Sequence, residues 1–295
     1  MKKRRGLLFM PGNNPGMLST SVILGADTVI FDLEDSVIER EKTAARLLTR
    51  NALRTLKRRG VELLTRLNGL DTPFWRDDVD AAVSGGADGL VLPKCESRDH
   101  VHSLARAVEE DCTRHGRTGR MPLFLILETA LGIERAYDIG TAHPDIAGLF
   151  FGGEDLATDL GVRRTREGDE LIWGRSRMVN AAKAAGVTAI DTVFSDVDDL
   201  EGLALDSLKG RQLGYDGKCI ISPQQINIVN SIFQPSEEEL EWARRVLAAE
   251  KIATRDGKGA VSLDGKMVDM PIIVRARRIM EQSGEMIGCE VVDHV

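Results

Sequence analysis

Short runs of hydrophobic residues alternate with longer amphipathic stretches along most of the chain. The runs are continuous rather than interleaved with polar residues, which is the pattern of strands buried on both faces of a parallel sheet. Eight strands are predicted, at residues 6–10, 28–32, 61–67, 89–92, 123–127, 146–151, 187–190 and 218–221.

Helical patterns with an apolar face fill the intervals between these strands. The clearest lie at residues 42–59, 98–114, 130–140, 170–184 and 196–209. Strand and helix therefore alternate eight times, which predicts an α/β protein built as a (β/α)8 TIM barrel. A doubly wound open sheet is the alternative architecture for the same alternation.

The chain continues past the eighth unit with a different pattern. Ser236 and Glu239 form a capping box at the start of a further helix. Asp264-Gly265 between two short β-type runs predicts a hairpin, and a final helix follows it. The sequence therefore predicts a barrel domain over residues 1–234 and a C-terminal helical and hairpin lid extension over residues 235–295.

The composition limits which partners and which cellular compartment are expected for this protein. Of 295 residues 42% are hydrophobic, and 39 basic side chains stand against 46 acidic ones, a formal charge of −7. A nucleic-acid-binding protein would carry a basic footprint, so no nucleic-acid partner is expected. No apolar run approaches the roughly 18 residues that a membrane span needs, and the apolar run near the start is too short for a signal peptide. A cytoplasmic protein with reduced cysteines is expected.

Charged or polar side chains follow most of the predicted strands, at the end where a barrel gathers its chemistry. A single such residue could be a solvated loop residue, but six of eight strand ends on one rim indicate a site. The residues, in chain order, are Asp32, Glu34, Asp35, Arg66, Lys94, Glu128, Gly152, Gly153 and Asp155. Several carboxylates with an arginine and a lysine are the composition of a hard-cation site that handles an acidic substrate.

Oxygen ligands point to Mg²⁺, which usually takes one or two protein carboxylates and leaves the other positions to water and substrate. Glu128 and Asp155 are the candidate ligands, and Glu128 would thereby also contact substrate. Arg66 can donate two parallel hydrogen bonds to a substrate carboxylate. The amides of Gly152-Gly153 can bind a further carboxylate oxygen, and Lys94 is expected to orient a carboxylate or phosphate.

The acidic cluster after the second strand has two interpretations. Asp32 and Glu34 are candidate catalytic groups that hold metal-bound water or shift a pKa, or they cap the following helix together with Asp35. The sequence has no phosphate-binding loop, dinucleotide-binding or serine-hydrolase motif. Lys94 is the only strand-end lysine that could form a Schiff base, a role that the neighbouring charges disfavour. The residues do not identify the general base.

Together these motifs resemble the citrate lyase β subunits, within the wider HpcH/HpaI-type and acyl-CoA lyase group of TIM barrels. The resemblance covers essentially the whole chain. The motifs that carry it lie at residues 7–18, 31–35, 41–42, 66–73, 92–94, 153–155, 191–193, 214–218 and 262–269.

The resemblance implies roles for particular residues. The family's metal pair falls on Glu128 and Asp155, and its carboxylate-binding arginine falls on Arg66. Arg5 opens the family's N-terminal motif and is expected at the substrate. Asp269, in the C-terminal lid, is implied to be catalytic in a neighbouring subunit's site, although it could simply N-cap the last helix.

The reaction so implied is Mg²⁺-dependent cleavage of a citryl thioester, carried by CoA or an acyl-carrier subunit, to oxaloacetate and an acetyl thioester. The implied partners are a homo-oligomer, as a trimer or a multiple of one, and the citrate lyase α and acyl-carrier subunits. Two alternatives stay open. One is a stand-alone acyl-CoA lyase for malyl-, citramalyl- or citryl-CoA, and the other is a non-catalytic scaffold that retains the barrel.

Overall fold

The computed structural model describes residues 2–56, 60–255, 261–263 and 266–284. These residues form two compact units. One is the span Arg4–Phe233, and the other combines residues 2–3 with the described residues from 234 to 284.

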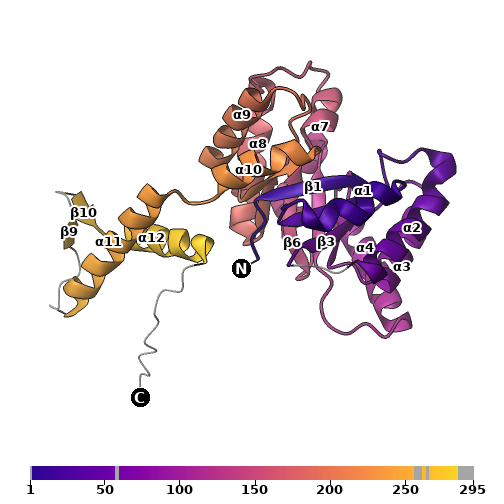
Figure 1. Cartoon of the computed structure of the whole chain (residues 1–295), viewed down its shortest axis with the longest axis horizontal. Helices are drawn as coiled ribbons and strands as arrows, with labels where there is room; N and C mark the ends of the chain where they lie inside the picture. The colour runs from indigo at the N-terminus through magenta and orange to yellow at the C-terminus, as the bar shows by residue number, and fades with distance from the viewer. Residues whose placement is uncertain (1, 57–59, 256–260, 264–265, 285–295) are drawn as a thin grey trace. The chain divides into compact units, whose positions relative to one another are not determined.

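Eight parallel strands close into a barrel in the first unit (Figure 1). Each strand pairs with its neighbours in the sequence, and the pairing of β1 with β8 closes the ring. The predicted TIM barrel is therefore confirmed, and the open sheet is excluded. The strands are β1 (Gly6–Pro11), β2 (Thr28–Asp32), β3 (Glu62–Arg66), β4 (Gly89–Leu92), β5 (Leu123–Leu127), β6 (Ile146–Phe151), β7 (Thr188–Asp191) and β8 (Gly217–Ile220).

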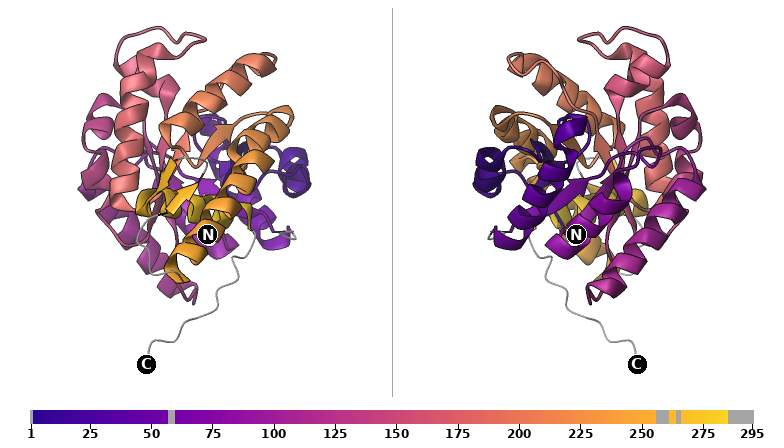
Figure 2. Two further views of the ribbon diagram at one scale, coloured as in Figure 1. Left: turned by 90° about the vertical axis from the view of Figure 1, so that its left-hand side faces the viewer. Right: turned by 90° about the vertical axis from the view of Figure 1, so that its right-hand side faces the viewer.

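Helices lie outside these strands, as Figure 2 shows. They are α1 (Pro15–Thr20), α2 (Lys42–Thr55), α3 (Trp75–Gly85), α4 (Arg98–Arg114), α5 (Ala130–Glu134), α6 (Ala136–Gly140), α7 (Gly153–Asp159), α8 (Ile172–Ala185), α9 (Leu200–Leu213) and α10 (Ile226–Phe233). Short 3-10 turns lie at η1 (Ser21–Ile23), η2 (Glu39–Glu41), η3 (Asp169–Leu171) and η4 (Pro223–Gln225).

Three predicted helices differ clearly from the structure, and the one expected at residues 42–59 ends at Thr55. The helix expected at residues 130–140 is two short helices separated at Arg135. The helix expected at residues 196–209 begins only at Leu200, because Asp199 caps it by accepting a 2.8 Å hydrogen bond from the amide of Gly202.

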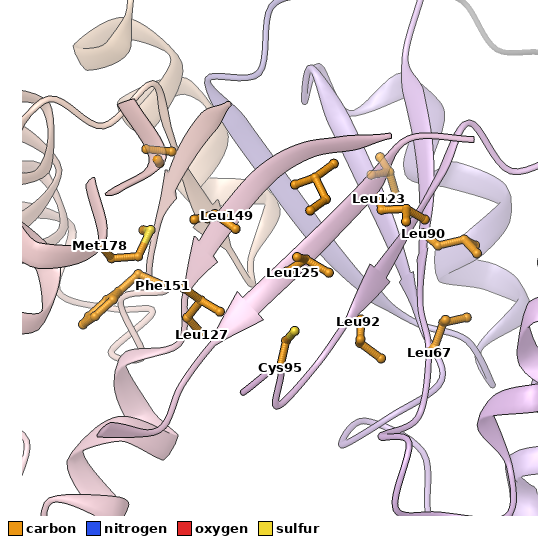
Figure 3. Close-up of a cluster of buried hydrophobic side chains, with 14 of the residues drawn as sticks. Leu67, Leu90, Leu92, Cys95, Leu123, Leu125, Leu127, Leu149, Phe151 and Met178 are labelled. Carbon is orange, nitrogen blue, oxygen red and sulfur yellow. The ribbon is translucent and has the colours of Figure 1, made fainter. Parts of the chain in front are cut away.

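The strands separate two apolar layers, because successive side chains of a strand point to opposite faces. Leu90 and Leu92 of β4 belong to the layer between strands and helices, part of which Figure 3 shows. Val91, between them, belongs to the barrel interior with Phe124 and Phe150. Burial on both faces explains why the strands are continuous apolar runs in the sequence.

The second unit is built on two helices, α11 (Glu237–Arg255) and α12 (Met270–Ser283), whose apolar faces share a core. The predicted capping box at the start of α11 is present, with reciprocal hydrogen bonds of 2.8 and 3.1 Å between Ser236 and Glu239. An antiparallel hairpin of β9 (Val261–Leu263) and β10 (Lys266–Val268) confirms the predicted one. The Asp264-Gly265 turn lies outside the described residues. None of the helices described is both long and apolar enough to cross a membrane.

Candidate active site

Arg66 is held in a fixed orientation at the carboxyl end of β3. The strand register sets it beside Asp32, the last residue of β2. Its Nε and Nη2 atoms each donate a 2.7 Å hydrogen bond to Asp32, one to each carboxylate oxygen. The guanidinium carbon also lies 4.9 Å from the centre of the Phe9 ring, so the group makes a cation–π contact with this ring.

Asp32 is fully engaged in this arrangement. Besides Arg66, it accepts hydrogen bonds from the amides of Glu34 (2.8 Å) and Ser36 (3.1 Å). Burial acts to raise the pKa of Asp32, but the charge and hydrogen bonds of Arg66 outweigh it and hold the pKa below its ordinary value. These contacts anchor Arg66 and the loop after β2, a role that neither interpretation included. The N-cap residues of η2 and α2 are Ile38 and Glu41, so Asp32 does not cap the following helix. Its catalytic role stays a prediction.

Glu34 differs from Asp32 because its carboxylate is poorly satisfied. Its Oε2 atom lies 2.8 Å from Arg66 Nη1 but outside hydrogen-bond geometry, and it accepts no hydrogen bond from the described residues. Its Oε1 atom lies 3.3 Å from Lys94 Nζ. Burial, only partly offset by Arg66, raises the pKa of Glu34 to about 7. A carboxyl group with this pKa can gain or lose a proton near neutral pH.

Glu128 follows β5 and is buried. Its Oε1 atom accepts a 2.7 Å hydrogen bond from the amide of Lys94, whose positive φ of 51° is unique among the non-glycine residues that the structure describes. Burial, together with the negative charges of Glu34 and Asp155, raises the pKa of Glu128 to about 8. The carboxylates are therefore crowded at a place where no cation of the described residues pairs closely with Glu128.

Glu128 and Asp155 fit a Mg²⁺ ion. They supply the hard oxygen ligands that it prefers, in the number that proteins usually offer it. Within the described residues no group of three or more His, Cys, Asp or Glu side chains is arranged to hold a metal, so water and substrate would complete the shell. Because Gly152 has no side chain, the Glu128 side chain can lie directly against it.

A cavity of about 450 Å³ opens at this rim. Arg66, Glu128 and Asp155 line its polar side, and Phe9, Ile126 and Phe150 are among its apolar residues. A second cavity, of about 530 Å³, shares Glu128 and Asp155 with the first and is lined by Lys94 on its other side. The pair of carboxylates thus has open space on two sides.

The structure corrects two expectations about substrate contacts. The amide of Gly152 donates to the carbonyl of Leu127 at 3.0 Å, and that of Gly153 to Thr192 Oγ1 at 2.9 Å. Both amides are therefore already used, and the glycines line the cavity without offering the N–H groups that the sequence suggested. Thr192, which directly follows β7, was not among the predicted site residues. Its hydroxyl positions the Gly152-Gly153 backbone after β6.

Arg5 is the second correction. It precedes β1, at the amino end of the barrel, where its Nε and Nη2 atoms each donate a 2.8 Å hydrogen bond to Asp27. Arg66 lies at the carboxyl end of its strand, on the opposite rim. The structure therefore does not bring Arg5 to the other predicted site residues, because a motif that begins before a strand places its first residue at the far end of the barrel.

Asp269 belongs to the second unit. Its Oδ1 atom accepts a 3.4 Å hydrogen bond from the amide of Ile272 and caps α12. The capping interpretation is therefore confirmed, while its catalytic role in a neighbouring subunit stays a prediction.

Comparisons with known proteins agree with this geometry. Residues 5–223 match the model of the family described as HpcH/HpaI aldolase/citrate lyase. The citrate lyase subunit beta of Leuconostoc mesenteroides subsp. cremoris is 40% identical over 279 residues, which are 94% of this chain and 92% of that protein. The (3S)-malyl-CoA thioesterase of Cereibacter sphaeroides (strain ATCC 17025) is 37% identical over 279 residues, 95% of this chain and 94% of that protein.

Solved structures give the same result. A crystal structure of the protein CitE from Mycobacterium tuberculosis in complex with magnesium, acetoacetate and coenzyme A has a TM-score of 0.79 and 33% identity, and covers 96% of this chain and 99% of that chain. A citrate lyase beta subunit from M. tuberculosis complexed with oxaloacetate and magnesium has a TM-score of 0.67 and 32% identity, over 79% of this chain and 98% of that chain. The chain is thus a member of the HpcH/HpaI aldolase/citrate lyase family.

Proposed function

We propose that this chain is a Mg²⁺-dependent carbon–carbon lyase that cleaves a citryl thioester to oxaloacetate and an acetyl thioester, as the β subunit of a citrate lyase. The observation that carries the proposal is the meeting of an anchored Arg66 with the Glu128 and Asp155 carboxylates on one cavity. The similarity to citrate lyase β subunits over nearly the full chain selects the reaction among those that such a site could perform.

The chemistry requires three things from the chain. A base must take the proton of the tertiary hydroxyl, so that the carbon–carbon bond breaks and its electron pair passes to the thioester as an enolate, which is then protonated. Glu128 and Asp155 would hold Mg²⁺, which when bound supplies a Lewis acid for the substrate's oxygens. Arg66 orients a substrate carboxylate, and Glu34 is the rim carboxyl suited to holding or moving a proton.

Assembly and location are part of this proposal. A homo-oligomer, as a trimer or a multiple of one, would let Asp269 of one chain complete the site of another. In a citrate lyase complex the α and acyl-carrier subunits would supply and carry the thioester. We place the enzyme in the cytoplasm. The statements on assembly rest on the family resemblance, and the location rests on the cysteines, which are scattered and form no C-x-x-C pair.

A second candidate is a stand-alone acyl-CoA lyase acting on malyl-, citramalyl- or citryl-CoA. The similarity to a (3S)-malyl-CoA thioesterase over 95% of the chain favours it, as does the coenzyme A bound by the related CitE protein. The two candidates share the site and differ in the acyl group and its carrier.

The test is release of a 2-oxo acid by the purified full chain with Mg²⁺. Citryl-, malyl- and citramalyl-CoA are compared at equal concentration, and oxaloacetate, glyoxylate and pyruvate are measured as the products. Preferred cleavage of citryl-CoA, abolished by EDTA and restored by Mg²⁺, is the expected result. Preference for another thioester would favour the second candidate. No product from any of the three would exclude CoA as the carrier, and a scaffold would be indicated if citrate bound to the acyl-carrier subunit also gave no oxaloacetate.

A further inference from the structure

Lys42, the first residue of α2, is a buried lysine that faces backbone rather than a carboxylate. Its Nζ atom donates hydrogen bonds to the carbonyl oxygens of Leu33 (2.8 Å) and Glu34 (2.7 Å). Only 9% of the residue is exposed. Burying an ammonium group is unfavourable unless hydrogen bonds replace its water, so these two bonds, with the negative charges of Asp32 and Glu34 nearby, stabilise its position.

The residue before it makes a matching contact. Glu41 Oε2 accepts a 2.6 Å hydrogen bond from the side-chain amide of Asn13, in the loop after β1. Adjacent residues at the start of one helix therefore fasten the loops that follow β1 and β2. The loop after β1 is also bonded to the end of β2, because the amide of Gly12 donates to the carbonyl of Asp32 at 2.8 Å.

The segment that Lys42 holds is the one that orients Arg66. The amide of Glu34 donates to Asp32, and Asp32 in turn accepts both hydrogen bonds of the Arg66 fork. The Leu33 and Glu34 residues are themselves buried. Without the ammonium, the carbonyl oxygen of Leu33 would lose this hydrogen bond and that of Glu34 would keep only the one from the amide of Val37, at 3.0 Å, or the segment would have to move towards water.

We propose that Lys42 is a positioning residue for the substrate-carboxylate site, which holds the backbone of residues 33–34 so that Asp32 and Glu34 fix the guanidinium of Arg66. The inference rests on the proposed function only in the choice of oxaloacetate as the ligand whose binding is measured. Within the part of the chain that the structure describes, Lys42 Nζ bonds to Leu33 and Glu34 and not to Glu128 or Asp155, which lie after β5 and on α7. The effect of losing the ammonium should therefore fall on the oxo acid and spare the metal.

The experiment compares wild type with Lys42→Met and Lys42→Gln in the full chain. Lys42→Gln keeps a neutral NH2 group that can donate to a carbonyl, and it replaces Lys42→Met in the comparison if that variant does not fold. Lys209→Met is the matched control, because Lys209 also donates to a backbone carbonyl, that of Glu167 at 3.0 Å, but on α9. Three quantities are measured: the Kd for oxaloacetate with Mg²⁺, the Kd for Mg²⁺ alone, and amide hydrogen exchange of residues 33–38.

We expect Lys42→Met to weaken oxaloacetate binding by about tenfold or more, the scale of a lost hydrogen bond to a charged group. The Kd for Mg²⁺ should change by less than about twofold, and exchange of residues 33–38 should become faster. In an Arg66→Lys background the same substitution should change the oxaloacetate Kd by less than about twofold, because both act on one contact. Lys209→Met should leave all three quantities unchanged.

Faster exchange with an unchanged oxaloacetate Kd would overturn the proposal, since the loop would then be loosened without reaching Arg66. Equal losses of oxaloacetate and Mg²⁺ affinity would also overturn it, because they indicate general damage to the rim. If wild type itself fails to bind oxaloacetate, the proposed function fails, and the exchange measurement still decides whether Lys42 fastens the loop.

Discussion

Gly152 lies against Glu128 so closely that a Cβ atom at residue 152 would stand 2.4 Å from the Glu128 Cβ and 2.6 Å from its Oε2. The contact comes from neighbouring strand ends, because β5 and β6 pair up to Leu127 and Phe151. The missing side chain at residue 152 therefore leaves room for Glu128 at the metal pair. The amide of Gly152 is itself bound to the carbonyl of Leu127.

Gly152→Ala is expected to weaken Mg²⁺ binding by about 10- to 100-fold, as changes beside a metal ligand do. The added methyl group must push the Glu128 side chain away, and overpacking of this kind costs about 1–3 kcal/mol of unfolding free energy. Titration calorimetry with Mg²⁺ and urea unfolding measure the two effects. Gly16→Ala is the control, because its Cβ would meet only Asn14 Oδ1, at 3.5 Å. A Gly152→Ala protein with wild-type Mg²⁺ affinity would contradict the assignment of Glu128 as a ligand.

The raised pKa values of Glu34 and Glu128 make a prediction about stability without metal. Their pKa values of about 7 and about 8 lie above that of an unfolded glutamate. Between pH 5 and 8, roughly, the native protein therefore binds more protons than the unfolded chain, and its unfolding free energy falls as pH rises. Urea unfolding in EDTA should show this fall, and Mg²⁺ should reduce it.

Glu128→Gln provides the control for this pH dependence. The glutamine keeps an oxygen for the Lys94 amide and cannot ionise, so the fall in unfolding free energy should be smaller than in wild type. Activity and Mg²⁺ binding should nevertheless be lost, because a carboxylate ligand is gone. Identical pH profiles for the two proteins would contradict the raised pKa of Glu128.

The barrel could be predicted from the sequence because strands buried on both faces have a simple hydrophobic pattern. Strands such as Leu123–Leu127 are uninterrupted apolar runs, and both β5 and β6 were predicted to the residue. The rim residues could be predicted from the same pattern, since Arg66 ends β3, Glu128 directly follows β5 and Asp155 lies four residues after the end of β6. Their meeting at one cavity is a consequence of the closed topology.

Hydrogen-bond partners could not be predicted in this way. Lys42 and Thr192 sit in motifs that were noticed in the sequence, but their roles depend on which carbonyl or amide lies within 3 Å, roughly, of their polar atoms. The same limit explains the error at Gly153, whose amide looked free until the Thr192 hydroxyl was placed. Arg5 was misplaced because a motif gives order along the chain, and the two ends of a strand lie on opposite rims.

Arg66→Lys is expected to weaken oxaloacetate binding by about 1.5–3 kcal/mol, the range for hydrogen bonds to charged groups. A single ammonium cannot fork onto Asp32 and keep a further donor free for substrate, as the guanidinium can. The Kd for oxaloacetate in the presence of Mg²⁺ measures the loss. Mg²⁺ affinity in the absence of oxaloacetate is the internal control and should stay near that of wild type. Unchanged oxaloacetate affinity would mean that another residue receives the carboxylate.

The role proposed for Asp269 can be separated from its capping role by one substitution. Asp269→Asn keeps the side-chain oxygen that accepts from Ile272, so the thermal stability of the second unit should hold. Turnover should fall sharply if the carboxylate takes part in the reaction. A fall in both stability and turnover would point to the cap alone.

Complementation then tests whether Asp269 acts in a neighbouring chain. Asp269→Asn and Glu128→Gln are each expected to be inactive alone. If the lid of one chain completes the site of the next, co-refolding them in equal amounts should give about one quarter of sites with both native residues, since barrel and lid are drawn independently in a symmetric oligomer. Activity should therefore return to about that fraction. Refolding each variant separately and mixing afterwards is the control. No recovery in oligomers shown to be mixed would mean that Asp269 serves its own chain or has no catalytic role.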